Sequence, residues 1–227
     1  RGLVRAYKRM DRLDEAESWV ETYLTEKPFS SAALYASGYI FFLKEDIKKA
    51  EELFKKALEQ DDTNALALNN LGAIRLSKKS YTQAVNLVRK AIQINPKEPM
   101  FFKNLETIYK QMGNPSLIIT DYNFYLKEKE DLDLIRGYGM AVGRNMRQAS
   151  FRLYNKGYLE KTILKWVEIE KIYKEIDHQS GLVSVYFSLG ILYEEKGESQ
   201  NAKNYFDLVL KLNPLHIQAK ERLYNIR

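Results

Sequence analysis

The segment Ala65–Pro96 reads ALALNNLGAIRLSKKSYTQAVNLVRKAIQINP, and its apolar residues follow the spacing of two short amphipathic helices. Pro96 stands where the second helix must end. Gly72 and Ala84 are small residues, one in each helix. Antiparallel helices pack roughly 8–10 Å apart, depending on the side chains at the contact. The segment therefore predicts an antiparallel helix pair whose closest contact lies between Gly72 and Ala84.

The same pattern returns when the window is shifted by 34 residues, so we expect the helix pair to repeat along the chain. The positions equivalent to Gly72 hold Val4, Gly38, Gly72, Glu106, Ser150 and Gly190. Those equivalent to Ala84 hold Ala16, Ala50, Ala84, Ile118, Thr162 and Ala202. Those equivalent to Pro96 hold Pro28, Asp62, Pro96, Glu130, Lys174 and Pro214. The repeats at 31–64, 65–98 and 183–216 match well, whereas those at 99–132 and 143–176 diverge from the pattern.

A 34-residue period with Leu-Gly, a downstream alanine and a closing proline resembles the tetratricopeptide repeat (TPR) family. The resemblance covers nearly the whole chain. It implies an all-α fold, a right-handed α-solenoid of about five to six antiparallel helix pairs with a C-terminal capping helix at 215–226. It implies no particular reaction, because TPR proteins share an architecture and not a chemistry. Arg1 falls inside a repeat, so we expect upstream sequence, with any targeting signal, to have been removed.

The spacing divides the chain into two expected parts. Residues 1–132 form an N-terminal TPR array with a truncated first repeat, and residues 133–227 form divergent TPR-like repeats with a long first helix and a capping helix. The insertion at 133–142, DLDLIRGYGM, breaks the period and is expected to extend the next helix backwards to near Asp131 or Asp133. That helix should run to about Asn155.

Three glycines in the insertion region, Gly137, Gly139 and Gly143, do not form a phosphate-binding loop. Their spacing departs from G-x-G-x-x-G, and no strand pattern precedes them. We therefore expect close helix packing there, or a pivot between the two parts. Trp166 takes the aromatic position of the following helix and is predicted to lie in the core.

Composition excludes several classes of function. Hydrophobic residues make up 45% of the chain and charged residues 29%, which is ordinary for a folded soluble protein. The absence of cysteine excludes disulfides, thiolate catalysis and cysteine zinc sites, and is compatible with both the cytoplasm and the periplasm. With two histidines and no carboxylate–histidine spacing, we expect no metal, no cofactor and no enzymatic activity. No apolar run approaches the roughly 18 residues of a membrane span.

The TPR resemblance implies a concave groove, and its first zone is apolar and aromatic. Tyr35, Tyr39 and Phe42 occupy groove-facing positions, and an exposed apolar patch there favours a binding site. Two alternatives stay open. The first helix of the truncated repeat covers this patch, or a second copy does.

The second zone carries amides. Asn69 and Asn70 in one repeat, with Lys103 and Asn104 in the next, also take groove positions. An amide offers a donor and an acceptor, which suits the backbone of an extended peptide. The alternative is that asparagine is simply tolerated at a solvated position. Only Asn70 fits the pattern of TPR grooves that grip a C-terminal carboxylate, so that specialisation is disfavoured.

The third zone is basic. Between Leu134 and Leu159 there is no acidic residue, and aromatic residues are interleaved with five cations: Arg136, Arg144, Arg147, Arg152 and Lys156. Arg144, Arg147 and Phe151 take groove positions. An acidic protein partner and structural pairing with acids such as Glu128, Glu130 and Asp131 are equally favoured, ahead of nucleic acid or lipid.

These zones predict a non-enzymatic scaffold that holds a partner segment with apolar anchors and acidic residues in its groove, within a multiprotein assembly. The net charge of +6 adds a mild preference for acidic partners. Two alternatives remain. One is a self-associating structural component of a larger assembly, and the other is a basic adaptor for nucleic acid or an anionic membrane. Richness in Lys, Ile, Asn and Tyr suggests a bacterial source, where similar TPR proteins serve envelope, secretion or motility assemblies.

Overall fold

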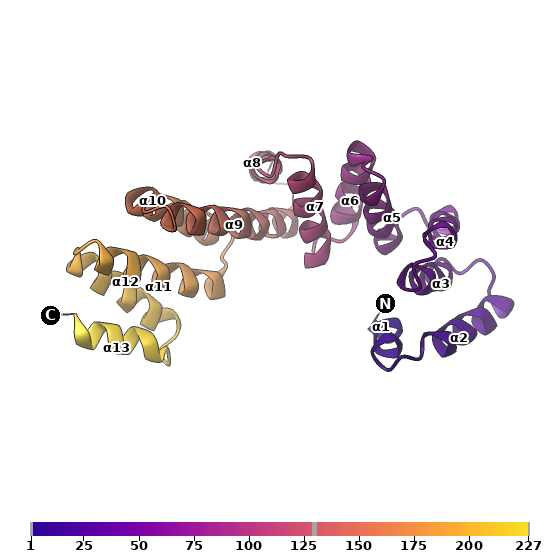
Figure 1. The fold of residues 1–227 in the computed structure, drawn as a ribbon, viewed down its shortest axis with the longest axis horizontal. Helices are drawn as coiled ribbons and strands as arrows, with labels where there is room; N and C mark the ends of the chain where they lie inside the picture. The colour runs from indigo at the N-terminus through magenta and orange to yellow at the C-terminus, as the bar shows by residue number, and fades with distance from the viewer. Residues whose placement is uncertain (1, 129–130, 227) are drawn as a thin grey trace. The chain divides into compact units, whose positions relative to one another are not determined.

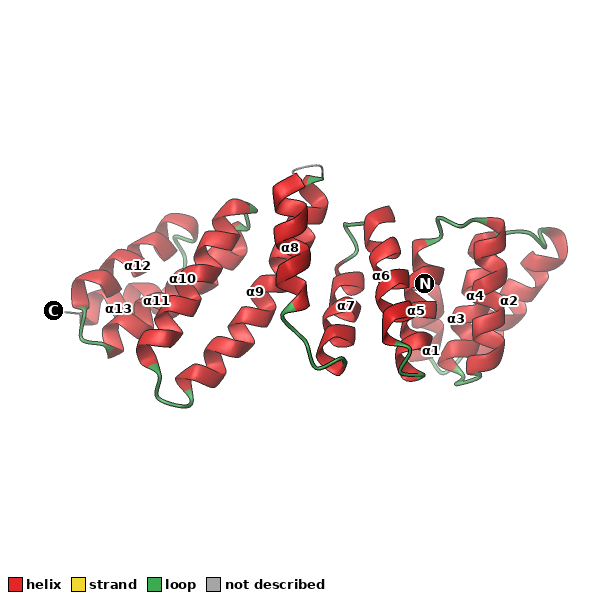
Figure 2. Cartoon of the chain, turned by 90° about the horizontal axis from the view of Figure 1, so that it is seen from above, coloured by secondary structure: helices red, strands yellow, loops and turns green. Residues whose placement is uncertain are grey.

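The computed structural model describes residues 2–128 and 131–226, and these residues form an α-solenoid of consecutive helix pairs without any strand (Figures 1 and 2). Arg1 and Glu130 lie outside the described residues. The helices are α1 (Gly2–Arg9), α2 (Leu13–Glu26), α3 (Ser31–Leu43), α4 (Ile47–Gln60), α5 (Ala65–Ser77), α6 (Tyr81–Ile94), α7 (Pro99–Gln111), α8 (Leu117–Glu128), α9 (Leu132–Tyr154), α10 (Leu159–Glu175), α11 (Gln179–Glu195), α12 (Ser199–Leu212) and α13 (Ile217–Asn225). The all-α class and the repeated helix pairs expected from the sequence are confirmed.

The chain forms two compact units, which we call unit 1 (Arg1–Gly113) and unit 2 (Asn114–Arg227). The boundary expected between residues 132 and 133 falls inside unit 2, because α8 packs against α9. A Cβ placed on Gly139 of α9 would lie 3.2 Å from the ring of Tyr122 on α8, which shows how closely the two helices approach. Helix α8 therefore belongs with the long helix that follows it.

The register of the small residues is confirmed by their burial. Ala50, Ala84 and Ala202 are all fully buried. A Cβ placed on Gly72 would lie 2.6 Å from Cγ2 of Val88 and 3.3 Å from the carbonyl oxygen of Ala84. Because such distances are too short for a side chain, the contact between these helices requires glycine at this position.

The divergent repeats keep the same contact with different side chains. Ile118, Ser150 and Thr162 are buried at their positions in the register, whereas Glu106 is half-buried. The hydroxyl of Ser150 donates to the carbonyl of Met146 at 2.9 Å, and that of Thr162 donates to the carbonyl of Tyr158 at 2.9 Å. Each polar side chain is thereby satisfied within its own helix, as buried serine and threonine commonly are.

Helix α9 is the single long helix that the insertion predicted. It is 23 residues long, and the carboxylate of Asp131 caps it by accepting from the backbone N–H groups of Asp133 and Leu134. Its glycines serve close packing against α10 and the residues that follow. A Cβ on Gly143 would lie 2.3 Å from the ring of Tyr173, and one on Gly139 would lie 2.8 Å from Ile176.

The last helix, α13, packs on α12 through the fully buried Ala219. Its N-terminus is capped by His216, whose Nδ1 accepts from the backbone N–H of Ala219 at 3.3 Å. Leu215 and Ile217 are exposed at the N-terminus of this helix, and Tyr224 is exposed near its C-terminus. The helix therefore covers α12 as expected, although its outer face is less polar than the sequence indicated.

A carboxylate at the junction of two repeats ties them together. Glu51 on α4 accepts from Arg75 at 2.9 Å and from Lys78 at 2.5 Å, both at the end of the α5 repeat helix, and also pairs with Lys55 of its own helix. The side chain of Glu51 is only 13% exposed. The hydrogen bond from Arg75, followed by that from Lys78, lowers the pKa of Glu51 to about 2.

We expect Ala84→Arg to destabilise unit 1 by more than about 3 kcal/mol, because it forces a long charged side chain into a fully buried contact. Urea denaturation followed by circular dichroism measures this free energy of unfolding. Asn86→Arg, at an exposed position of the same helix, is the matched control and should cost less than about 0.5 kcal/mol. Equal losses from both variants would contradict the assigned register.

We expect Glu51→Gln to lose about 2 kcal/mol of unfolding free energy at neutral pH. The folded-state pKa of Glu51, about 2, lies below the ordinary value of 4.5, so the charged carboxylate stabilises the folded chain above pH 4.5. That contribution is lost as the pH falls towards 2. Urea denaturation at pH 7, 4 and 2.5 should therefore show the variant and the wild type converging in acid. A difference that stayed constant over this range would show that the pairs do not act through charge.

Candidate functional site

The aromatic zone of unit 1 lies mostly in the core. Tyr35 and Tyr39 on α3 are only 4% and 6% exposed. Helix α1 covers them, since Val4 belongs to the same hydrophobic cluster and Arg5 Nε donates to the Tyr39 hydroxyl at 2.8 Å. The expectation of an exposed patch is therefore wrong for these two tyrosines, and the alternative that the first helix covers them is right. Phe42 is partly buried against the same cluster.

The amides of unit 1 bond to one another across two repeats. Asn104 on α7 donates from Nδ2 to Oδ1 of Asn69 on α5 at 2.7 Å, and Asn69 in turn donates to Oδ1 of Asn70 at 3.3 Å. Asn69 and Asn70 are buried, and the Nδ2 group of Asn70 has no hydrogen-bond partner among the described residues. Lys103 is exposed beside them on α7. The row of amides thus links α5 to α7, with a single buried donor left unsatisfied.

In unit 2, α9 brings the basic and aromatic residues of the third zone onto one face. Arg144, Arg147 and Phe151 follow helical spacing, three and four residues apart. The guanidinium of Arg147 lies 5.8 Å from the centre of the Trp166 ring on α10, and the ring of Phe151 meets the same indole edge to face at 6.1 Å. Trp166 itself is buried, as predicted. The Nε of Arg147 is buried and has no hydrogen-bond partner among the described residues.

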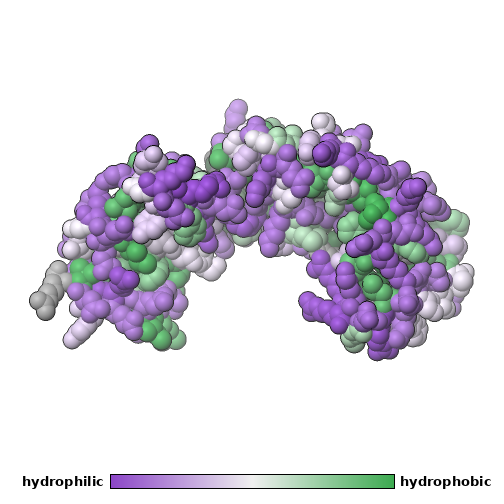
Figure 3. Space-filling model, in the orientation of Figure 1, coloured by the Kyte–Doolittle hydropathy of each residue, from purple (hydrophilic) through white to green (hydrophobic). Residues whose placement is uncertain are grey.

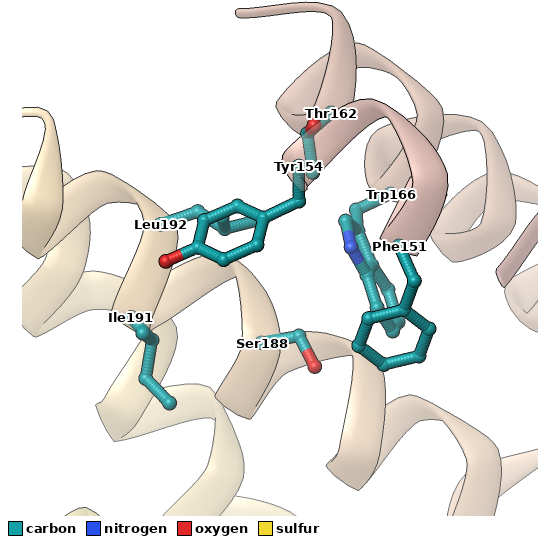
Figure 4. A pocket seen from close by; sticks show the side chains of 7 residues that line it. All are labelled: Phe151, Tyr154, Thr162, Trp166, Ser188, Ile191 and Leu192. Atoms are coloured by element: carbon teal, nitrogen blue, oxygen red, sulfur yellow. The ribbon is translucent and has the colours of Figure 1, made fainter. Parts of the chain in front are cut away.

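Phe151 and Trp166 border a pocket of about 200 Å³ (Figure 4). Tyr154 and Leu192 stand on one side of it and Trp166 and Phe151 on the other. The pocket is lined by Phe151 and Tyr154 of α9, Thr162 and Trp166 of α10, and Ser188, Ile191 and Leu192 of α11. Its volume is below the roughly 300–1,000 Å³ of ordinary small-molecule sites. The pocket is therefore of a size for one large side chain.

The polar groups around this pocket are largely satisfied within the chain, which leaves an apolar interior. The hydroxyl of Ser188 donates to the carbonyl of Ser184 at 2.9 Å, and the Tyr154 hydroxyl donates to the carboxylate of Glu195 at 2.9 Å. The bond to Glu195 raises the pKa of Tyr154. Phe151 remains 55% exposed although its ring contacts Trp166. Figure 3 shows hydrophobic residues (green) breaking the hydrophilic surface of both units.

The other cations of the basic stretch have varied roles. Arg136 donates from Nε to the carbonyl of Ile176 at 3.2 Å, which is a structural contact. Arg152 and Lys156 are exposed. Of the acids expected to pair with this stretch, Asp131 caps α9 instead, and Glu130 lies outside the described residues. The stretch is therefore structural at Arg136, and its side chains are solvent-exposed at Arg152 and Lys156.

Sequence reasoning missed the contribution of α11 to the pocket. Ile191 follows Gly190 just as Phe151 follows Ser150, so the two residues share one position of the repeat register. The sequence could therefore have indicated Ile191 as a site residue, through the register position that it shares with Phe151. Ser188 and Leu192 gave no comparable signal, because their part in the pocket depends on how α9, α10 and α11 pack.

Two kinds of feature are absent from the residues that the structure describes. Within residues 2–128 and 131–226, no group of three histidine, aspartate or glutamate side chains could hold a metal ion. Over the same ranges, no helix has the length and apolar character needed to cross a bilayer.

Comparison with known proteins matches the chain to models of the tetratricopeptide repeat over residues 1–65, 41–103 and 183–214. The human Protein O-mannosyl-transferase TMTC3 is 26% identical over 97% of this chain and 26% of its own length. The Type IV pilus assembly protein PilF of Pseudomonas aeruginosa is 30% identical over 48% of this chain and 44% of its own length. The chain thus spans less than half the length of these two curated relatives.

Two solved structures share the fold. One is the C-terminal part of a TPR repeat-containing protein from Cytophaga hutchinsonii, 16% identical, covering 96% of this chain and 83% of that one, with a TM-score of 0.54. The other is Pseudomonas aeruginosa PilF, 21% identical, covering 97% of this chain and 93% of that one, with a TM-score of 0.50. At these identities the likeness concerns the fold alone.

We expect Tyr39→Ala to cost about 3 kcal/mol of unfolding free energy, because it empties a buried position and removes the acceptor of Arg5. Phe151→Ala should cost less than about 1 kcal/mol, since that ring is mostly exposed. Urea denaturation of both variants measures the difference. Should Tyr39→Ala prove as mild as Phe151→Ala, α1 would not cover α3 in solution.

Proposed function

The chain belongs to the tetratricopeptide repeat family, and from this premise we propose that it is a non-enzymatic scaffold holding a segment of a protein partner within a multiprotein assembly. Proteins of this family act as interaction scaffolds in assemblies. One relative, PilF, is named for pilus assembly, and its match supports a role of this general kind. The human relative is named as a transferase, and this chain aligns with only 26% of its length.

The observation that carries the proposal is the pocket of unit 2. It is an apolar recess of about 200 Å³ with aromatic walls, Phe151, Tyr154 and Trp166 among them, and it opens beside an arginine. Binding energy at protein interfaces concentrates where a large anchor side chain fills such a desolvated recess. An aromatic or large aliphatic side chain of the partner would fill this one.

Arg147 gives the anchor a charged neighbour. Its Nε is buried and has no hydrogen-bond partner in the part of the chain that the structure describes, and a buried donor in that state costs roughly 1–3 kcal/mol until an acceptor arrives. A carboxylate next to the anchor would accept from this group, and hydrogen bonds between guanidinium and carboxylate are among the strongest in proteins. The partner segment would therefore combine an apolar anchor with an acidic residue.

Unit 1 has a smaller part in this proposal. Lys103 is exposed and Asn104 is half-buried, so both remain candidates for contact with a partner backbone. Asn69 accepts a hydrogen bond from Asn104 and donates one to Asn70, so the buried amides hold the Asn104 side chain in place. Tyr35 and Tyr39 are buried, so in this proposal they pack in the core and do not contact the partner. Phe42 is only partly buried.

The proposal is tested with a phage-displayed library of random 12-residue peptides. We expect the wild-type chain to enrich peptides that carry an aromatic or large aliphatic residue with Asp or Glu three or four positions away. Fluorescence anisotropy of a selected peptide should show at least tenfold weaker binding to Ser188→Trp, which fills the pocket, and to Arg147→Glu, which reverses the charge.

Tyr224→Ala, which removes an exposed aromatic residue far along the chain, is the matched control and should leave peptide binding unchanged. Each variant should melt within about 2 °C of the wild type for the comparison to hold. If the Ser188→Trp protein enriched the same peptides as the wild type, with the same affinity, the pocket would not be the binding site.

A further inference from the structure

We infer that the pocket of unit 2 accepts helix α2 from a second copy of this chain, with Trp19 as the anchor. This inference rests on the proposed function, in that it names an occupant for the pocket proposed above as a binding site. Four observations lead to it: an exposed aromatic stripe on α2, opposite charge on the two elements, equal spacing of their charged residues, and their location in different units.

Helix α2 presents an aromatic stripe that is largely exposed, although Lys27 Nζ lies 5.3 Å from the centre of the Tyr23 ring. Trp19 is 69% exposed and Tyr23 is 43% exposed, and the two lie four residues apart on the same face of the helix. Glu15 and Glu26 stand on that face at the two ends of the stripe. Tryptophan and tyrosine have a large apolar body with a polar tip, which suits them to protein contacts.

The two elements carry opposite charge. Between residues 13 and 26 there are five acidic residues and no cation, whereas residues 134–159 contain five cations and no acidic residue. On α2, Asp14 and Glu17 pair with Lys44, and Glu15 pairs with Arg12. The charge that remains negative on α2 would meet the arginines of α9, and complementary charge steers association and suppresses wrong partners.

The spacing of the charged residues agrees on the two helices. On α9, Arg147 and Arg144 precede Phe151 by four and seven residues. On α2, Glu15 precedes Trp19 by four residues and Glu26 follows it by seven. At a rise of about 1.5 Å per residue, these separations are about 6 Å and about 10.5 Å on both helices.

With Trp19 placed beside Phe151, a carboxylate meets a guanidinium whichever way α2 runs. Antiparallel helices bring Glu26 towards Arg144, whereas parallel helices bring Glu15 towards Arg147, for which Glu15 would exchange its pair with Arg12. The indole N–H needs an acceptor when it is buried. The hydroxyl oxygen of Ser188 can supply one, because its own proton is already donated to Ser184.

This contact would join unit 1 of one molecule to unit 2 of the next. An interface between two different surfaces of the same chain is heterologous, so it generates a ring if the rotation closes and an open filament if it does not. We therefore expect the weight-average mass of the wild-type chain to rise with concentration, as measured by light scattering or sedimentation velocity.

A mixing experiment tests the heterologous contact directly. Trp19→Ala loses the anchor and keeps the pocket, whereas Ser188→Trp keeps the anchor and fills the pocket. Each variant alone should remain a monomer over the range where the wild type associates. An equimolar mixture should form a dimer and no larger species, because one intact anchor meets one intact pocket and both remaining ends are blocked.

Two further measurements distinguish this contact from nonspecific hydrophobic association. Tyr224→Ala removes another exposed aromatic side chain and should associate as the wild type does. Arg147→Glu should weaken association at least tenfold, and raising the salt concentration should weaken the wild type several-fold, because charges at the rim are screened.

A wild-type chain that stays monomeric at all concentrations would overturn the inference, and so would a mixture of the two variants that stays monomeric. Association of Trp19→Ala equal to that of the wild type would also overturn it. The peptide selection described above is an independent measurement on the same pocket. Peptide binding by a chain that is strictly monomeric would leave the proposed function standing and remove only the second copy as the occupant.

Discussion

The close contact between paired helices is the constraint on which the rest of this structure depends. At Gly38, Gly72 and Gly190, a Cβ would lie within 3 Å of a side chain from the opposite helix. The space that glycine leaves is filled by Phe54, by Val88 or by Phe206 respectively. Each repeat contacts mainly its neighbours, so the stability of a solenoid is the sum of such local contacts. Loss of one contact therefore affects its own unit first.

The same constraint, applied to a longer helix, creates the pocket of unit 2. Gly139 and Gly143 let Ile176 and Tyr173 approach α9 closely along its first half. The second half of α9 extends beyond these glycines and carries Arg147 and the aromatic residues to the side of Trp166. Because α11 packs on α10, its side chains complete the recess.

The aromatic residues of α3 in unit 1 and of α9 in unit 2 differ in their burial. In unit 1 the tyrosines of α3 are covered by α1 and one of them accepts from an arginine, so the apolar surface there has become core. In unit 2, Phe151 and Tyr154 are about half exposed around an apolar recess, beside Arg147, whose Nε has no hydrogen-bond partner within residues 2–128 and 131–226. Exposed apolar surface is typical of sites that bind a partner. For this reason unit 2 carries the proposed binding site.

The sequence by itself determined the helix pairs, the register of the small residues and the long helix that begins near Asp131 or Asp133. These features follow from periodicity and from caps, which are properties of short segments of chain. It also indicated Arg147 and Phe151, since helical spacing places them on one face. Only the tertiary structure decided that Tyr39 is buried and that Ser188 and Leu192 join Phe151 around one pocket. Burial depends on which distant helix covers a given face, and helical periodicity carries no information about that neighbour.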